Sequence, residues 1–480
     1  SVLNLHLLWR CREHLPVSIA KKMLVYLIVF LFASQVKGTD ICNTGLCVCR
    51  YKNVKNEDFA GRTIKCSYSS IKRIIETNHT LPNRVSSLDL SSNNITEIKT
   101  SNLLTSNTLT ELVLKDNGIK EIRGNVLQLP GLKRLDLSDN YLEFIDKETF
   151  RDIKKLEYLN LANNKFTTFA KLTFHHLGKL NEVILNNNAI GPVLHHTNLF
   201  DRSGFGLTNT IQALSISGIN LTNVPDNFFV DAYDLRKLTI ANNSIDEIFE
   251  IPFTLQYLDL SDNPITDIAI EDLDLPGLKV LKLNNLQINE VTESMFASLK
   301  SLKVLELERN RNLSVFSSFA FGRNVLEDAD DFVLERLSLK GSRLSQLDSG
   351  LLEPFSQLIV LDLQGNPWMC DCNIGWVKQL KIPERYYDHL RCASPASLFN
   401  ARIFDLKAKY FVCKNRHIGA TIAVVAFCTL LSTIAVVMFV CLPKSQSRCK
   451  LLRNLYSPSA AYSILPISAR FQSDRNINNL

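Results

Sequence analysis

The sequence predicts an α/β solenoid, a curved stack of similar coils whose short strands form one parallel, concave sheet. Disulfide-bonded caps would close its ends, and one transmembrane helix would follow. Three observations predict this architecture. A phrase with leucines at fixed positions recurs along most of the chain, as in LDLSDN at 135–140 and again at 258–263. Cysteines cluster before and after these phrases. Two uncharged, apolar segments lie nearer the ends of the chain.

The first apolar segment, residues 24–32, follows Lys21, Lys22 and Met23. It is short for a membrane span and fits the apolar region of a secretory signal peptide. We therefore expect residues 1–22 to lie upstream of the true start and residues 23–38 to be removed after Gly38. An N-terminal membrane anchor is the alternative.

The recurring phrase, L-x-x-L-x-L-x-x-N, divides residues 85–365 into about 12 repeats. Alternating leucines within it predict a short strand with one buried face. One coil cannot shield its own apolar edge, so the coils must stack, which is the signature of leucine-rich repeats. The repeats begin at Val85, Leu109, Leu132, Leu156, Leu180, Ile211, Leu235, Leu255, Leu278, Leu302, Leu334 and Leu358.

An asparagine ends most of the phrases, where the strand turns inward and leaves backbone groups without ladder partners. Its amide both donates and accepts, so it can satisfy those groups. Ile219, Leu286 and Ser342 replace it in three repeats. Because isoleucine and leucine cannot hydrogen-bond through their side chains, we expect irregular coils at repeats six and nine. The asparagines are Asn93, Asn117, Asn140, Asn164, Asn188, Asn243, Asn263, Asn310 and Asn366.

Eight cysteines flank the repeats, within an N-terminal cap (39–84) and a C-terminal cap (366–413). In an oxidising compartment they indicate four disulfides without fixing the partners, and a metal site on the two C-x-C pairs is the rival. The stretch NPWMCDCNIGW at 366–376 resembles the C-terminal cap of extracellular leucine-rich-repeat proteins. That resemblance implies the pairs Cys42–Cys49, Cys47–Cys66, Cys370–Cys392 and Cys372–Cys413.

The second apolar segment, residues 418–442, carries no charge. As a helix it would extend about 37 Å, enough for a hydrocarbon core of about 30 Å. Lys444 and Arg448 follow it, which favours a cytoplasmic tail at 443–480 and an exterior N-terminus. The chain thus resembles Toll-like receptor ectodomains without an intracellular signalling domain. In the tail, Tyr462 and Leu465 resemble a sorting signal for clathrin adaptors.

The net charge of +6 comes from the ends of the chain, and residues 39–442 carry about −3, so nothing points to nucleic acid. Polar residues on strands of repeats two to four predict a protein-binding patch, with an ordinary solvated sheet face as the alternative. Five N-glycosylation sequons lie in the part of the chain that we expect to be extracellular. A glycan on the sequon in repeat seven would obstruct a ligand there, so we favour repeats two to five for ligand contact. The patch residues are Glu111, Asp116, Asp136, Tyr158, Asn160 and Asn163, and the sequons are at Asn78, Asn94, Asn220, Asn242 and Asn312.

Two repeats carry insertions, at 195–210 and 321–332, which are either recognition loops or bulky turns. The pairs His175-His176 and His195-His196 lack a third ligand, so we expect no metal or cofactor. The sequence contains no G-x-S-x-G motif, H-E-x-x-H motif or phosphate-binding glycine loop, so we expect no enzyme activity. We expect a single-pass type I plasma-membrane receptor for recognition or adhesion, binding a protein or glycoconjugate alone or as a homo- or hetero-dimer. The alternatives are an innate-immune co-receptor or decoy, and a structural surface component.

Overall fold

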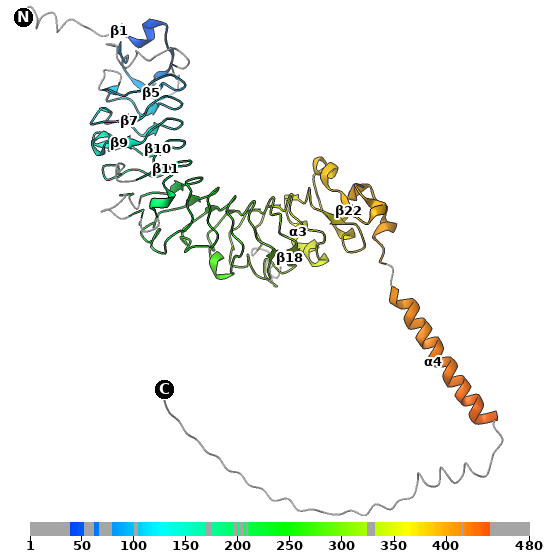
Figure 1. Cartoon of the computed structure of the whole chain (residues 1–480). Helices are drawn as coiled ribbons and strands as arrows, with labels where there is room; N and C mark the ends of the chain where they lie inside the picture. Colours follow the sequence, from blue (N-terminus) through cyan, green and yellow to red (C-terminus); the bar gives the residue numbers. More distant parts are fainter. Residues whose placement is uncertain are drawn as a thin grey trace, which may run out of the picture. The chain divides into compact units, whose positions relative to one another are not determined.

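The computed structural model describes residues 39–51, 62–66, 79–99, 104–168, 174–194, 199–200, 206–207, 210–323, 332–413 and 416–441. The chain divides into two compact units, residues 1–412 and 413–480, and Figure 1 shows the stacked coils of the first. Several predictions concern residues outside the described ranges: the signal peptide, the sequon at Asn78, most of both insertions, and the tail with Tyr462 and Leu465.

A sheet of 14 strands runs through the first unit and confirms the predicted parallel sheet of a leucine-rich-repeat solenoid. It opens with the antiparallel pair β2 (Val48–Tyr51) and β3 (Arg62–Lys65), and β3 then pairs in parallel with β5 (Val85–Asp89). The parallel strands continue as β6 (Glu111–Val113), β8 (Arg134–Asp136), β10 (Tyr158–Asn160), β11 (Glu182–Ile184), β12 (Ala213–Ser215), β13 (Lys237–Thr239), β14 (Tyr257–Asp259), β15 (Val280–Lys282), β17 (Val304–Glu306), β19 (Arg336–Ser338) and β20 (Val360–Asp362).

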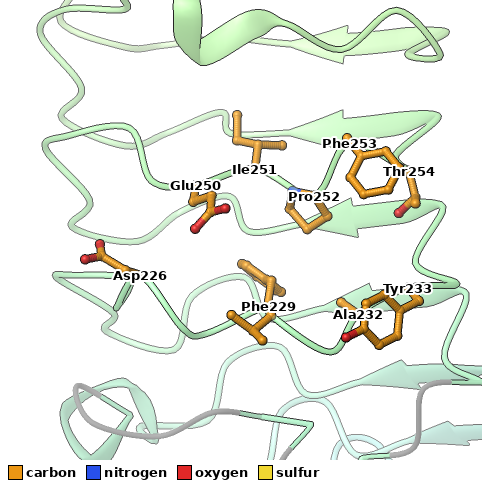
Figure 2. Close-up of a pocket in the computed structure, with 10 residues that line it drawn as sticks. Asp226, Phe229, Ala232, Tyr233, Glu250, Ile251, Pro252, Phe253 and Thr254 are labelled. Atoms are coloured by element: carbon orange, nitrogen blue, oxygen red, sulfur yellow. The ribbon is translucent and has the colours of Figure 1, made fainter.

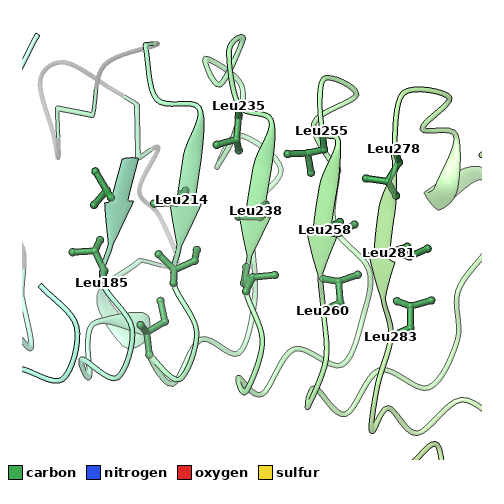
Figure 3. Packing of buried hydrophobic residues seen from close by; sticks show 14 of the residues in the cluster. Leu185, Leu214, Leu235, Leu238, Leu255, Leu258, Leu260, Leu278, Leu281 and Leu283 are labelled. Carbon is green, nitrogen blue, oxygen red and sulfur yellow. The ribbon is translucent and has the colours of Figure 1, made fainter. Parts of the chain in front are cut away.

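The register of the sheet places the central residue of each strand opposite the central residue of the next, as in Leu258 beside Leu281. These central side chains are buried, and so are the leucines just before and after each strand. Figure 3 shows Leu255, Leu258 and Leu260 packed beside the equivalent leucines of the next coil. Burying one such side chain contributes about 1.5–3 kcal/mol, so each coil is stabilised mainly by its two neighbours.

The turn asparagines act as predicted. The Asn140 amide nitrogen donates to the Leu114, Leu137 and Ser138 carbonyl oxygens at 3.0–3.1 Å. Its Oδ1 accepts the Ile119 backbone N–H at 3.1 Å. The same pattern recurs from coil to coil, so the side chain of each asparagine joins its own coil to the preceding one.

The expectation of irregular coils at repeats six and nine is wrong for the sheet, because β12 and β15 pair with both neighbours over three residues each. The hydrogen bonds that form the sheet are made by backbone groups and do not need the turn amide. The Gln287 N–H, for example, donates to the Ile265 carbonyl oxygen at 2.9 Å, as the Tyr141 N–H donates to the Ile119 carbonyl oxygen in a coil that has the asparagine. Repeats six and nine therefore differ from the other coils only in their turns, where the asparagine is missing.

Short elements return the chain on the other side of the coils. Aromatic residues fill the interior there, as in the stacked rings of Phe150 and Phe174, whose centroids lie 6.4 Å apart. The elements are β7 (Glu121–Ile122) paired with β9 (Phe144–Ile145), β16 (Glu290–Val291) paired with β18 (Val315–Phe316), the 3₁₀-helices η5 (Lys147–Phe150), η6 (Gly191–Val193), η7 (Glu271–Leu273) and η8 (Ser349–Leu351), and α3 (Leu352–Ser356).

Disulfides hold both caps. The N-terminal cap contains β1 (Thr39–Asp40), β4 (His79–Thr80), η2 (Ile41–Thr44) and the bonds Cys42–Cys49 and Cys47–Cys66. The C-terminal cap contains the bond Cys370–Cys392, and Cys372 and Cys413 are also disulfide-bonded. Cysteines in this state cannot serve as thiolate ligands, so the rival metal site on the C-x-C pairs is ruled out.

The buried Trp368 indole N–H of the C-terminal cap donates to the Leu363 carbonyl oxygen at 3.0 Å. The Trp376 indole N–H likewise donates to the Leu347 carbonyl oxygen at 3.3 Å, so both tryptophans attach the cap to the last coils. The elements of this cap are β21 (Trp368–Met369), β22 (Cys392–Ser394), η9 (Gly375–Gln379), η10 (Glu384–His389), η11 (Ala396–Leu398), η12 (Ile403–Asp405) and η13 (Ala408–Phe411).

The second unit contains the helix α4 (Arg416–Cys441), which covers most of the second apolar segment. Within the stretches of chain that the structure describes, no helix combines the length and the apolar character that a membrane span requires.

Candidate ligand-binding face

The six candidate residues lie on the exposed side of the sheet and at its edge. Glu111 and Tyr158 are the first residues of β6 and β10, and these first strand residues form a column that we call column one. Asp136 and Asn160 are the last residues of β8 and β10, and these positions form column two. Asp116 and Asn163 lie in the turns that follow β6 and β10, in a third row that we call the turn row.

Column one brings together Glu111, Arg134 and Tyr158 on three adjacent strands. The Arg134 guanidinium lies over the Tyr158 ring, 3.9 Å from its centroid, and its Nε lies 3.7 Å from Glu111 Oε1. Glu111 also accepts a hydrogen bond from the Ser87 hydroxyl at 2.8 Å. Sequence reasoning missed Arg134, although it stands in the same register position as Glu111 and Tyr158. The arginine keeps 53% of its side chain exposed, so its guanidinium can still donate to a partner.

Burial, followed by the carboxylates of Asp136 and Glu182, raises the pKa of the Tyr158 phenol above its ordinary value. The phenol therefore stays protonated at neutral pH and can donate a hydrogen bond. In column two, Asp136 Oδ1 accepts the Ser138 N–H at 2.9 Å. Asn160 Oδ1 accepts the Ala162 N–H at 3.0 Å. These local bonds fix the two side chains before any ligand arrives.

Asp89, in column two of the first repeat, is held by the same kind of local bond, from the Ser91 N–H at 2.9 Å. Its carboxylate also lies 3.2 Å from the Lys65 ammonium of the N-terminal cap. Burial raises the pKa of Asp89, but the Ser91 hydrogen bonds and the Lys65 charge together outweigh it. The net pKa is therefore lower than the ordinary value.

The turn row consists of residues with left-handed backbone conformation, just before the turn asparagines. Asn163 donates to Asp139 Oδ1 at 2.8 Å and accepts from the Asn187 amide at 2.6 Å. Gly218 occupies this position in repeat six, where a Cβ would lie 2.2 Å from Asn187 Oδ1. The glycine thus leaves room for the side-chain amide of Asn187, the last of these hydrogen-bonded side chains in the turn row. Asp116 is exposed in the same row, so the structure places it with Asn163 but apart from Glu111 and Tyr158.

Four of the five sequons lie within described residues, and Asn94, Asn220, Asn242 and Asn312 are all exposed. Asn242 occupies the turn row of repeat seven, with a backbone φ of 52°. A glycan attached there would stand at the edge of the sheet, two repeats after Asn187. The preference for repeats two to five as the contact region stays a prediction.

The later half of the face carries similar contacts among its own residues. The Lys237 ammonium lies 5.3 Å from the centroid of the Tyr257 ring, and the Lys282 ammonium lies 3.0 Å from Glu306 Oε2. Burial lowers the pKa of Lys282, but the hydrogen bond and charge of Glu306 outweigh it and raise the net value. Lys282 therefore remains a cation engaged by its own neighbour.

The arrangement supports recognition by hydrogen bonds, ion pairs and ring stacking. In the part of the chain that the structure describes, no group of three or more histidine, cysteine, aspartate or glutamate side chains is placed to hold a metal ion. The His175 ring lies against Gly206, and His195-His196 falls outside the described residues.

Comparison with known proteins agrees with the leucine-rich-repeat fold. A family model described as leucine rich repeat matches residues 130–190 and 253–311. Chaoptin from Tribolium castaneum is 29% identical over 320 residues, which cover 63% of this chain and 40% of that protein. Tsukushi from Gallus gallus is 31% identical over 283 residues, covering 58% of this chain and 60% of the relative. Toll-like receptor 9 from Mus musculus is 27% identical over 230 residues, covering 44% of this chain and 21% of the relative.

The repeats, the parallel sheet and the bonded cysteines define a leucine-rich-repeat protein with disulfide-bonded, cysteine-rich caps. It is related to Chaoptin, Tsukushi and a Toll-like receptor, and it spans between 40% and 60% of the length of the first two.

Proposed function

We propose that this chain is a non-catalytic cell-surface receptor for recognition or adhesion. It binds a protein or glycoconjugate ligand through the exposed sheet face of repeats two to five. The observation that carries the proposal is the stack of Glu111, Arg134 and Tyr158 across three adjacent strands, with a guanidinium fixed in place but half exposed. Tyrosine and arginine are enriched among the residues that dominate binding energy at protein interfaces.

Preorganisation supports the same face. Column two and the turn row are held by local hydrogen bonds, so a ligand would not have to order these side chains when it binds. The exposed Asn242 sequon would place a glycan over repeat seven and direct a large ligand toward the earlier repeats. A ligand that binds to repeats two to five should keep its affinity for an Asn242→Gln variant. A large change in that affinity would argue against binding at repeats two to five.

The cell-surface location rests on the sequence. Residues 418–442 are uncharged, and basic residues follow them, which favours an anchor with an exterior solenoid. The helix α4 covers most of this segment, and a helix is the conformation that an anchor would need. Extraction of the full chain from membranes at alkaline pH tests the anchor, since a chain released without detergent would refute it.

The binding face is tested by screening the full chain, displayed on cells, against a library of extracellular proteins and glycans. For any ligand found, Arg134→Ala should weaken binding about tenfold or more, as is typical of a central arginine. Lys237→Ala is the matched control, because Lys237 also lies over a tyrosine of the same sheet column. Equal losses in both variants, or a loss in neither, would refute the assignment to repeats two to five.

A co-receptor or decoy that acts with a signalling receptor is the second candidate, and the similarity to Toll-like receptor 9 favours it. Adhesion predicts that cells displaying the chain aggregate, whereas a co-receptor predicts co-precipitation with a signalling receptor without aggregation.

A further inference from the structure

Repeat seven is the shortest repeat, with 20 residues between Leu235 and Leu255 where most others have 23 or 24. The missing residues belong to the returning half of the coil, opposite the sheet. A cavity of about 170 Å³ opens there between repeats six and seven. Figure 2 shows it between the segment that carries Asp226, Phe229 and Tyr233 and the segment 250–254.

Apolar side chains around this cavity are unusually exposed. Phe253 keeps 74% of its surface exposed and Tyr233 keeps 58%, and Val230 beside them is also more than half exposed. Phe229 is buried and forms the floor, packed on Phe228 and Phe249 with ring centroids 4.9 and 5.7 Å away. A rigid floor with exposed aromatic walls is the arrangement that protein interfaces use for an apolar anchor.

Acidic residues outnumber basic ones around the cavity. Residues 221–278 contain 12 aspartates and glutamates against two basic residues, Arg236 and Lys237. Arg236 donates to the Thr254 carbonyl oxygen at 3.1 Å, and Lys237 lies on the sheet face over Tyr257. In Figure 2, Asp226 and Glu250 lie toward one end of the cavity, and Phe253 and Tyr233 lie toward the other.

We propose that this cavity docks a basic, apolar segment of a partner protein, in which an arginine or lysine stands next to a large apolar side chain. The apolar group would pack between Phe253 and Tyr233 on the Phe229 floor. The cation would lie between the carboxylates of Asp226 and Glu250, where the field of the surrounding acidic residues favours it. This surface lies on the side of the coils opposite the ligand-binding face, so the proposal does not depend on the function proposed above.

The test uses the full chain, immobilised on a biosensor through a tag, and a synthetic peptide that alternates arginine and leucine. We expect saturable binding that weakens as salt is added, because exposed charges are screened. Phe253→Ser should weaken binding about tenfold or more, as expected for an apolar anchor. Glu250→Gln should weaken it by a smaller factor and reduce its dependence on salt.

Phe399→Ser is the matched control, since Phe399 is 72% exposed but lies in the C-terminal cap. It should leave peptide binding unchanged. Equal losses in the two phenylalanine variants, or equal binding of peptides with glutamate in place of arginine or serine in place of leucine, would overturn the proposal. Self-association of the chain that Phe253→Ser abolishes would also overturn it, because the occupant would then be a second copy.

Discussion

Replacing Asn140 by alanine tests how the coils are joined. Four backbone groups lose a hydrogen bond to the Asn140 amide: the Ile119 N–H and the carbonyl oxygens of Leu114, Leu137 and Ser138. All four are buried away from solvent, where a polar group without a partner is costly. The expected loss depends on which of them find another partner.

The three carbonyl oxygens each keep one. The Leu114 oxygen still accepts from the Asn117 amide, and the Leu137 oxygen still accepts from the Asn164 amide. The Ser138 oxygen still accepts from the Asp116 N–H, and all three distances are 3.0 Å. The Ile119 N–H has no such second acceptor among the described residues, so it alone is orphaned. An orphaned buried donor costs about 1–3 kcal/mol, and the lost second bonds add little, so we expect a destabilisation of about 2–3 kcal/mol.

The assay combines denaturant unfolding of the full chain with amide hydrogen exchange, which reports local opening. Exchange at Ile119 should accelerate more than exchange in the distant coils. Asn93→Ala is the control, because Asn93 Oδ1 accepts no hydrogen bond from any described residue, so its removal orphans no N–H among them. It should cost less than Asn140→Ala. A loss below about 0.5 kcal/mol for Asn140→Ala, or unchanged exchange at Ile119, would refute the reasoning.

The core, the first coil and the C-terminal cap each allow a further test. Leu258→Ala should lower the unfolding free energy by about 2–5 kcal/mol in denaturant unfolding, whereas Asp259→Ala on the exposed side of the same strand should change it far less. The pKa of Asp89 is lowered on folding, so its charged form stabilises the folded state. This contribution is present at neutral pH and is lost as the pH falls below about 4. When unfolding is measured against pH, the Asp89→Asn variant should lack this part of the acid sensitivity. Replacing Cys370 and Cys392 together by serine should cost about 2–5 kcal/mol, and an unchanged thermal transition would contradict that expectation.

The leucine phrase was sufficient to predict the sheet because it has a fixed period. Each strand is set by residues within one coil, and each coil contacts only its neighbours, so no long-range pairing had to be guessed. The expected irregularity at Ile219 was wrong for the sheet because side chains are only part of the supply of donors and acceptors. β12 pairs with both neighbouring strands through backbone groups alone, without the turn amide.

The candidate site was harder to predict because ligand contacts need no period. Glu111 and Tyr158 were found as polar residues on strands, but Arg134 between them was missed, since a basic residue in a mixed column resembles ordinary solvated surface. The cavity behind repeat seven has a clearer signal in the sequence, a repeat that is several residues short within an acidic stretch. In a solenoid a shortened coil uncovers its neighbour, because no other part of the chain can cover the gap. In this chain the shortest repeat marks a place where the stack exposes apolar surface, and the spacing of the leucine phrases locates it.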